Sequence, residues 1–223
     1  MIKLSYTSLN NLHNGHEWLN KQMGIKIPDY SFLKEGTEAH RLIQDHVSGK
    51  TPHEFLKHIE VSFPIVEEIS DEKDPEYWNA KEKCKFSKTI GDKYEIYGYI
   101  DGLNETYKQF LEIKSSSDPW SISKFKNAMQ RKIYAWAKPE YKEAFLITGQ
   151  KDPARWEKEA PKLYSLQNTD QDREEAENWI LEGIRILEVG VFNKGLDSEG
   201  FCQGCFWNMP RYRQLANCNF IKQ

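Results

Sequence analysis

Apolar residues recur at helical spacing along the first sixty residues, which predicts three helices. The first is predicted over residues 5–22, behind a start rich in serine and threonine that can supply a cap. The second follows Gly36 and places His40 in its first or second turn. The third is short and begins at Pro52, because residues 51–54 have the spacing of a capping box.

From about residue 83 the pattern changes to short runs that are rich in β-branched and aromatic residues. Three such runs, separated by turn residues, are predicted as strands over 83–90, 94–101 and 109–114. Because the runs follow one another closely, we expect them to form an antiparallel meander.

Helical spacing returns over residues 121–137, with an apolar stripe that can pack on the sheet. Two further strands are predicted over 143–148 and 162–166, and the first is apolar enough to be central. A long helix follows over 170–187, before an irregular tail that contains cysteines. This order of elements predicts an α/β fold with a central mixed β-sheet flanked by helices, with N-terminal helices and a C-terminal helical cap.

The composition fits one globular domain. Of 223 residues, 39% are hydrophobic and 29% are charged, which allows a sizeable core and a solvated surface. We expect a single domain over 1–223, with an N-terminal helical part (1–60), a core that carries the candidate site (81–166), and a C-terminal helix and tail (167–223).

Charge and hydropathy constrain the partners and the location. The formal net charge is −3, so DNA would have to be bound by a local basic strip and not by the global field. No apolar run is long enough for a membrane span, and the first residues do not resemble a signal peptide. We therefore expect a cytoplasmic protein without a membrane partner.

Three charged residues in the predicted meander point to one site. Asp101 ends one predicted strand and Glu112 lies near the end of the next, so a hairpin can bring both carboxylates to the same end of the sheet. Lys114 lies two residues after Glu112 and therefore faces the same side. Two neighbouring carboxylates repel unless a cation lies between them, which favours Mg²⁺ or Mn²⁺. Together with the lysine, such a cation suits the hydrolysis of a phosphodiester.

Each of these features also has a structural interpretation. An Asp-Gly pair after a strand is a common turn, and a Glu-x-Lys pair at a strand edge is usually a solvated face. His40 also fits a packed or capping histidine. The order of the features favours the catalytic interpretation, because the acid-bearing strand, the turn, the Glu-x-Lys strand and an amphipathic helix follow one another.

Four short motifs occur in order along residues 36–134. They are Gly-Thr-Glu-Ala-His at 36–40, Gly-Tyr-Ile-Asp at 98–101, Glu-Ile-Lys at 112–114, and the pair Gln130 and Tyr134. In this order the motifs resemble those of the PD-(D/E)XK nuclease superfamily and, within it, the RecB-like exonuclease branch. Residues 4–9 are also similar to the opening segment of that branch.

The resemblance implies a metal-dependent DNA nuclease. His40, Asp101, Glu112 and the main-chain carbonyl of Ile113 would bind the metal, and Lys114 would position the water or the phosphate. A nitrogen ligand favours Mn²⁺ somewhat over Mg²⁺. The resemblance further implies exonuclease action on single-stranded or end-bearing DNA, in recombination, repair or phage replication, with a helicase or recombinase as a candidate partner.

The predicted helix over 121–137 carries further candidates. Gln130 and Tyr134 lie four residues apart on one face and can lean toward the site, although a helix that only packs shows the same spacing. Trp120 and Phe125 can stack on unpaired bases, while core packing is the simpler interpretation of Phe125. Four basic residues are predicted phosphate contacts, with a solvated basic face as the alternative: Lys124, Lys126, Arg131 and Lys132.

Two other functions stay open at this point. A sequence- or structure-selective endonuclease with the same centre would cut closed circular DNA, which an exonuclease leaves intact. A nucleic-acid-binding module with a decayed centre is the second alternative. The presence of His40, Asp101, Glu112, Lys114 and Gln130 argues against decay.

The cysteines leave three alternatives. Many RecB-like nucleases bind an iron–sulfur cluster through one cysteine before the histidine motif and three near the C-terminus. Here Cys202, Cys205 and Cys218 are candidate ligands, but residues 10–19 contain no cysteine, and Cys84 would have to reach a distant tail. A zinc site that includes a histidine is the second alternative, and reduced, unligated thiols are the one we favour.

Overall fold

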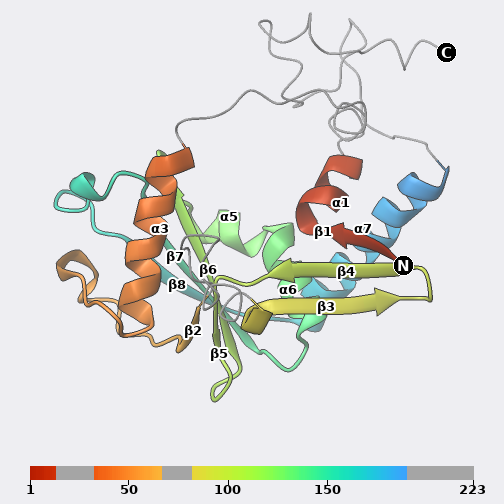
Figure 1. Ribbon diagram of the computed structural model, residues 1–223, viewed down its shortest axis with the longest axis horizontal. Coiled ribbons are helices and arrows are strands. Elements are labelled where there is room, and N and C mark those ends of the chain that lie inside the picture. The colour runs from red at the N-terminus through yellow and green to blue at the C-terminus, as the bar shows by residue number, and fades with distance from the viewer. Residues whose placement is uncertain (14–32, 67–81, 190–223) are drawn as a thin grey trace, which may run out of the picture.

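A computed structural model gives the structure of residues 1–13, 33–66 and 82–189 (Figure 1). The protein has an α/β fold in which helices flank two mixed β-sheets. The predicted fold class is thereby confirmed, but the strands form two sheets where one central sheet was predicted. Of the predicted C-terminal part, the long helix over 170–187 is present as α7 (Asp170–Val189), and the tail from residue 190 lies outside the described residues.

The smaller sheet has the strand order β1–β4–β3. Strands β3 (Lys85–Ile90) and β4 (Tyr94–Tyr99) form an antiparallel hairpin, and the positive φ of Gly91 in its turn suits a residue without a Cβ. Strand β1 (Ile2–Ser5) pairs with β4 in parallel. This strand was not predicted, because four residues are too few to show a clear period of two.

The larger sheet has the strand order β2–β5–β6–β7–β8. Strands β6 and β7 are parallel, and the other neighbours are antiparallel. As predicted from its apolar sequence, β7 lies inside the sheet, between β6 and β8. The strands span Ile65–Val66 (β2), Gly102–Asn104 (β5), Gln109–Ser116 (β6), Glu143–Gln150 (β7) and Lys162–Gln167 (β8).

The predicted three-stranded meander is wrong, because β6 pairs with β5 and not with β4. The chain leaves the smaller sheet after Tyr99, passes through Ile100 and Asp101, and enters the larger sheet at Gly102. A Cβ on Gly102 would lie 3.3 Å from the side chain of Leu111, so glycine allows β5 to lie close to β6. Asp101 consequently lies at the junction of the two sheets.

Helices cover both faces of the larger sheet (Figure 1). Helix α3 packs on one face of β6 and β7, whereas α5, α6 and α7 share a buried cluster with the other face. None of the described helices is long and apolar enough to cross a membrane. The helices span Tyr6–His13 (α1), Leu33–Val47 (α3), Ile122–Lys126 (α5), Met129–Ala137 (α6) and Asp170–Val189 (α7), with 3-10 turns at Glu54–Leu56 (η1) and Pro153–Arg155 (η2).

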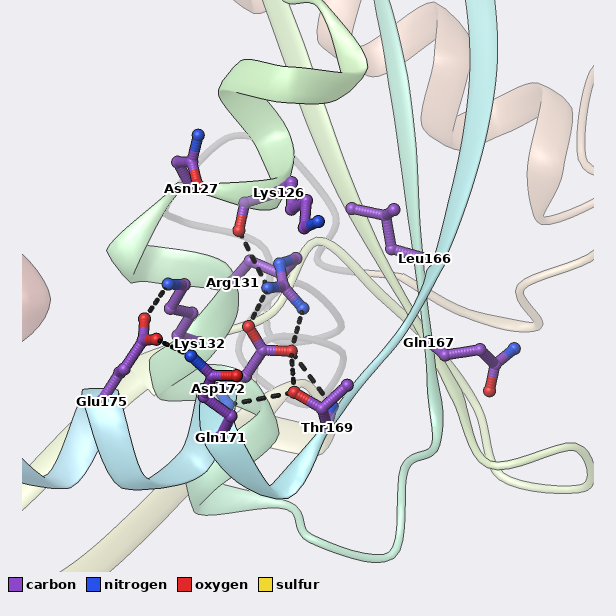
Figure 2. Close-up of a pocket in the computed structure, with 10 residues that line it drawn as sticks. All are labelled: Lys126, Asn127, Arg131, Lys132, Leu166, Gln167, Thr169, Gln171, Asp172 and Glu175. Carbon is purple, nitrogen blue, oxygen red and sulfur yellow. Dashed lines mark hydrogen bonds and ion pairs between the residues drawn. The ribbon is translucent and has the colours of Figure 1, made fainter.

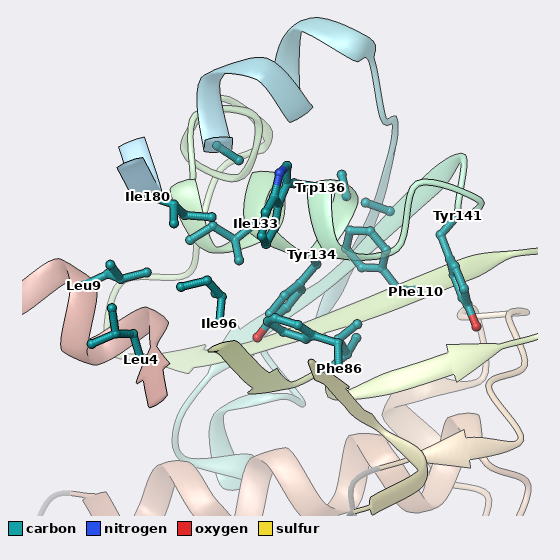
Figure 3. Close-up of a cluster of buried hydrophobic side chains, with 14 of the residues drawn as sticks. Leu4, Leu9, Phe86, Ile96, Phe110, Ile133, Tyr134, Trp136, Tyr141 and Ile180 are labelled. Carbon is teal, nitrogen blue, oxygen red and sulfur yellow. The ribbon is translucent and has the colours of Figure 1, made fainter. Parts of the chain in front are cut away.

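The alternation of side chains along β6 divides the core into two clusters. Leu111 and Ile113 belong to the cluster on the α3 side, whereas Phe110 belongs to the cluster with α6 and α7 (Figure 3). Because successive strand residues face opposite sides, Glu112 and Lys114 lie on the same face as Phe110. The candidate carboxylate and lysine therefore face α6.

The predicted helix over 121–137 is two helices, α5 and α6. Ser121 caps α5 by accepting a hydrogen bond from the Lys124 amide at 3.2 Å, and the extended conformation of Ala128 separates the two helices. Phe125 is fully buried, whereas Ile122 in the same predicted stripe is 44% exposed. The apolar spacing continues across the break, so the sequence pattern gave no indication of it.

Three further helix boundaries differ from the predictions. Helix α3 begins at Leu33, before Gly36. The predicted helix at residue 52 is only the turn η1, which His53 caps by accepting from the Phe55 amide, so the predicted capping box with Thr51 is wrong. Of the predicted helix over 5–22, α1 accounts for residues 6–13, and residues 14–22 lie outside the described ranges.

Candidate active site

The carboxylate of Asp101 binds the end of β6. Its Oδ2 accepts a 2.6 Å hydrogen bond from the amide of Ile113. The pairing of β5 with β6 stops at Leu111. Beyond that pair, the Asp101 carboxylate accepts the hydrogen bond that a main-chain carbonyl of a neighbouring strand would accept. The amide and the carbonyl of one strand residue point the same way, so the carbonyl of Ile113 also faces Asp101. Asp101 and β6 thus meet as predicted, but at a junction between sheets and not through a β4–β6 hairpin.

Glu112 is a buried carboxylate with few partners. Its side chain is 3% exposed and forms an ion pair with Lys114. Apart from that pair, neither of its buried oxygens accepts a hydrogen bond from the residues that the structure describes. Burial raises the pKa of Glu112 to about 7, an effect that Lys114 and His40 oppose and Asp101 reinforces. A negative charge on Glu112 is therefore only partly compensated.

Lys114 is held by a chain of hydrogen bonds that leads to helix α6. Its Nζ donates to Gln130 Oε1 at 3.1 Å, Gln130 Nε2 donates to the Tyr134 hydroxyl at 2.6 Å, and that hydroxyl donates to the carbonyl of Tyr99 at 2.9 Å. Burial lowers the pKa of Lys114, but the charges of Glu112 and its neighbours outweigh this and raise it overall. The structure thus joins the two predicted helix residues to a protonated lysine.

His40 reaches the site from helix α3. Its Nε2 lies 3.7 Å from Asp101 Oδ1, and its side chain is 20% exposed. One turn later, the buried Gln44 donates a 3.4 Å hydrogen bond to the carbonyl of Asp101. Gln44 was missed in the sequence, although its i+4 spacing from His40 places both on one helix face.

The residues predicted to bind a metal ion fit a divalent cation in their chemistry. His40, Asp101, Glu112 and the carbonyl of Ile113 offer one nitrogen and several oxygens. Within the described ranges, no three His, Cys, Asp or Glu side chains are arranged as a metal-binding group. In this structure Asp101 accepts a hydrogen bond from the Ile113 amide, and Glu112 pairs with Lys114. The poorly compensated Glu112 is the observation that fits a cation.

Tyr6, the first residue of α1, also lies near the site and was missed. Burial raises the pKa of Tyr6, the charge of Lys114 lowers it and that of Glu112 raises it, so the phenol lies within electrostatic range of both. Its ring stacks on Trp179 of α7 with centroids 5.9 Å apart. The one indication in the sequence was the motif over residues 4–9.

Trp120 lies between Lys114 and helix α5. Its ring centroid is 5.3 Å from Nζ of Lys114 and 4.7 Å from Nζ of Lys124. The Trp120 amide donates a 2.8 Å hydrogen bond to Oγ1 of Thr148, which is 1% exposed. The indole is partly exposed, whereas Phe125 is fully buried and packs in the core.

The guanidinium of Arg131 is buried in an ion pair with Asp172 and does not face solvent, where a phosphate contact was predicted for it. The residue is 2% exposed, and both terminal nitrogens of its guanidinium donate to the carboxylate of Asp172 (Figure 2). It also donates to Asn168 Oδ1 at 3.0 Å and to the carbonyl of Lys126 at 2.9 Å. The first turn of α7 packs over this position, so Arg131 joins two helices of the core.

Of the other three predicted phosphate contacts, one lysine is held in an ion pair and two are exposed to solvent. Lys132 pairs with Glu175 and, with Lys126 and Asp172, lines a polar cavity of about 330 Å³ between the α5–α6 segment and the start of α7 (Figure 2). Lys124 and Lys126 are exposed on α5. They are the predicted basic residues that remain open to a ligand.

The predictions for the cysteines concern mainly residues outside the described ranges. Cys202, Cys205 and Cys218 all lie there. Cys84 is buried just before β3, where a strand was predicted to include it. An iron–sulfur cluster or a zinc site in the tail stays a prediction.

Comparisons with known proteins identify no family. No family model matches this sequence, and no curated protein matches it. A crystal structure from Eubacterium rectale, named "Putative exonuclease", is similar to this chain with a TM-score of 0.44 and 14% sequence identity. The similarity covers 84% of this chain and 80% of that one. A likeness at this level does not establish a shared activity.

Proposed function

We propose that the protein is a metal-dependent deoxyribonuclease that hydrolyses phosphodiester bonds. The observation that carries this proposal is the buried carboxylate of Glu112, which lies beside a protonated lysine and near a second carboxylate, that of Asp101, at the junction of the two sheets. Burying like charges is costly without a cation, and protein sites with such charges are often functional.

In this proposal Asp101, Glu112, His40 and the carbonyl of Ile113 hold Mg²⁺ or Mn²⁺. When bound, a divalent cation neutralises charge on the phosphate and makes water more acidic. Lys114 donates to a non-bridging oxygen of the scissile phosphate, where negative charge builds up during attack. The hydrogen bond from Lys114 to Gln130 would hold the ammonium in place if Glu112 paired with the divalent cation.

The reaction adds water across a phosphorus–oxygen bond. A water oxygen attacks phosphorus, the bond from phosphorus to the leaving sugar oxygen breaks, and a proton from the water ends on that oxygen through solvent. No covalent enzyme intermediate is needed, so the chain must supply only orientation and charge stabilisation. The network from Lys114 to the Tyr99 carbonyl, through two side chains of α6, supplies the orientation.

The choice of DNA, and of exonuclease action in recombination, repair or phage replication, rests on the resemblance to RecB-like nucleases of the PD-(D/E)XK superfamily. Lys124 and Lys126 on α5 are exposed and provide a local basic strip for a phosphate backbone. A helicase or recombinase partner belongs to the same proposal.

The test is a degradation assay on linear and closed circular DNA, single- and double-stranded, with Mg²⁺ or Mn²⁺. We expect Lys114→Ala and Asp101→Ala to lose most of the activity. Lys108→Ala is the matched control, because Lys108 is exposed in the turn that precedes β6, at the opposite end of that strand from Lys114. Equal activity in all these proteins would refute the proposal, provided that circular dichroism shows each variant folded.

The same assay separates the two modes of cleavage. An exonuclease degrades linear DNA and leaves closed circles intact. Cutting of closed circles at defined positions would support the endonuclease alternative with the same centre.

A further inference from the structure

The segment between β6 and α5 places an indole beside the candidate catalytic lysine. Strand β6 ends at Ser116, two residues after Lys114, and Trp120 follows after a short loop. The ring centroid of Trp120 lies 5.3 Å from Nζ of Lys114. A group bound by the ammonium is therefore within reach of the indole.

The backbone at Trp120 is fixed by strand β7 of the larger sheet. The Trp120 amide is bound to the hydroxyl of Thr148 on β7, which is 1% exposed. Part of the ring packs against the buried cluster on the α6 side, and the remainder is exposed. Ser121, the next residue, caps α5. The indole is therefore held in place before a ligand arrives, so little conformational entropy is lost when it binds one.

The ammonium groups of Lys114 and Lys124 both lie over the Trp120 ring. Nζ of Lys124 lies 4.7 Å from the ring centroid, and Lys126 is exposed further along α5. A flexible lysine on an aromatic ring gains little free energy at an exposed site, so a phosphate can draw it away. An aromatic ring bordered by ammonium groups is the arrangement that proteins use to bind a single strand, with bases on the ring and phosphates on the charges.

We infer that Trp120 stacks on the base of the nucleotide next to the phosphate held by Lys114, so that this one side chain selects unpaired over paired DNA at the site. This inference rests on the proposed function. In an intact duplex both faces of each base are covered by neighbouring bases, and freeing one costs a few kcal/mol. A single strand or a frayed end presents a free base without that cost. Stacking is tolerant of sequence, so the site selects unpaired DNA and not a particular base.

The experiment measures binding in EDTA, where no hydrolysis occurs. Fluorescence polarisation of labelled oligothymidine and of a blunt-ended duplex with G·C-rich ends is compared for wild type, Trp120→Ala and Trp120→Phe. Tyr107→Ala is the control, because Tyr107 is an aromatic residue that is 71% exposed on the β5–β6 turn. We expect Trp120→Ala to weaken single-strand binding about 5- to 100-fold, with duplex binding unchanged. Trp120→Phe should retain most of the affinity, and Tyr107→Ala all of it.

Two results would overturn the inference. One is unchanged single-strand binding by Trp120→Ala. The other is an equal loss for single-stranded and duplex DNA, which would assign Trp120 a structural role only. Because Trp120→Phe preserves an aromatic ring, its behaviour separates lost stacking from a disturbed fold.

The polarisation assay also separates this inference from the proposed function. If wild type degrades no DNA with Mg²⁺ or Mn²⁺, the proposed function fails, while single-strand binding by Trp120 is still measured in EDTA. If wild type is an active nuclease and Trp120→Ala has the same KM as wild type for single strands, only the stacking inference fails. With both correct, Trp120→Ala raises KM for single strands more than it lowers kcat.

Discussion

Replacement of Asp172 by alanine should strongly destabilise the protein, although Asp172 lies outside the candidate site. Arg131 is 2% exposed, and the carboxylate of Asp172 is its only charged partner among the described residues. Without that carboxylate, the guanidinium would retain only two neutral acceptors, Asn168 Oδ1 and the carbonyl of Lys126. The buried Nε of Arg131 already lacks a hydrogen-bond partner within residues 1–13, 33–66 and 82–189.

The expected magnitude follows from the cost of an uncompensated buried charge. Removing one partner of a buried ion pair costs about 3–5 kcal/mol, compared with a typical total stability of about 5–15 kcal/mol. For a protein of this length, such a loss lowers Tm by about 6–20 °C. Arg131→Met should cost less, because Asp172 would keep its hydrogen bonds from the Thr169 amide and hydroxyl and lies nearer to solvent. The double variant should be more stable than Asp172→Ala alone.

Urea unfolding and thermal melts of the three variants measure these differences. Glu182→Ala is a matched control on the same helix, because the Arg185–Glu182 pair is exposed and should contribute little. A loss for Asp172→Ala no larger than that for Glu182→Ala would refute the structural role of Arg131. A large loss of DNA binding by a fully folded Arg131→Met variant would instead support the direct contact of Arg131 with phosphate that was predicted from the sequence.

The remaining predictions concern the candidate site. In EDTA, the stability of wild type relative to Glu112→Gln should fall as the pH rises from 4.5 to about 7. The reason is that folded Glu112 keeps its proton up to a pKa of about 7, whereas unfolded glutamate releases its proton near 4.5. Thermal melts across this pH range measure the difference in stability. Asp101→Ala should weaken Mn²⁺ binding in isothermal titration, whereas Lys114→Ala should leave it largely intact and suppress turnover. Equal Mn²⁺ affinity in both variants would contradict the assigned roles. Gln130→Ala should lower turnover about tenfold or more, since it removes a hydrogen bond to a charged group, and Tyr134→Phe should lower it less. Unchanged turnover of Gln130→Ala in steady-state kinetics would show that α6 does not position Lys114.

Local patterns predicted the elements of the core well. The apolar sequence of β7 placed it inside the sheet, and the two-residue spacing of Glu112 and Lys114 placed them on one face. The four-residue spacing of Gln130 and Tyr134 likewise held, because α6 is regular over that interval. Such predictions depend only on the periods of a strand and a helix.

Predictions that depended on long-range pairing were less successful. Neither the division into two sheets at residues 100–101 nor the strand β1 was apparent, because a strand's partner is not encoded in its own period. The burial of Arg131 was missed for a related reason. Its partner Asp172 lies 41 residues away, and only the docking of α7 brings the two together.

The sequence by itself determined which residue types were available for chemistry and on which face of each element they lie. Only the tertiary structure decided that Asp101 binds the end of β6 from a sheet junction, that Glu112 is buried with little compensation, and that Trp120 lies beside Lys114. The physical reason is that the period of an element fixes directions within it, whereas burial and charge compensation depend on neighbours that are distant in the chain.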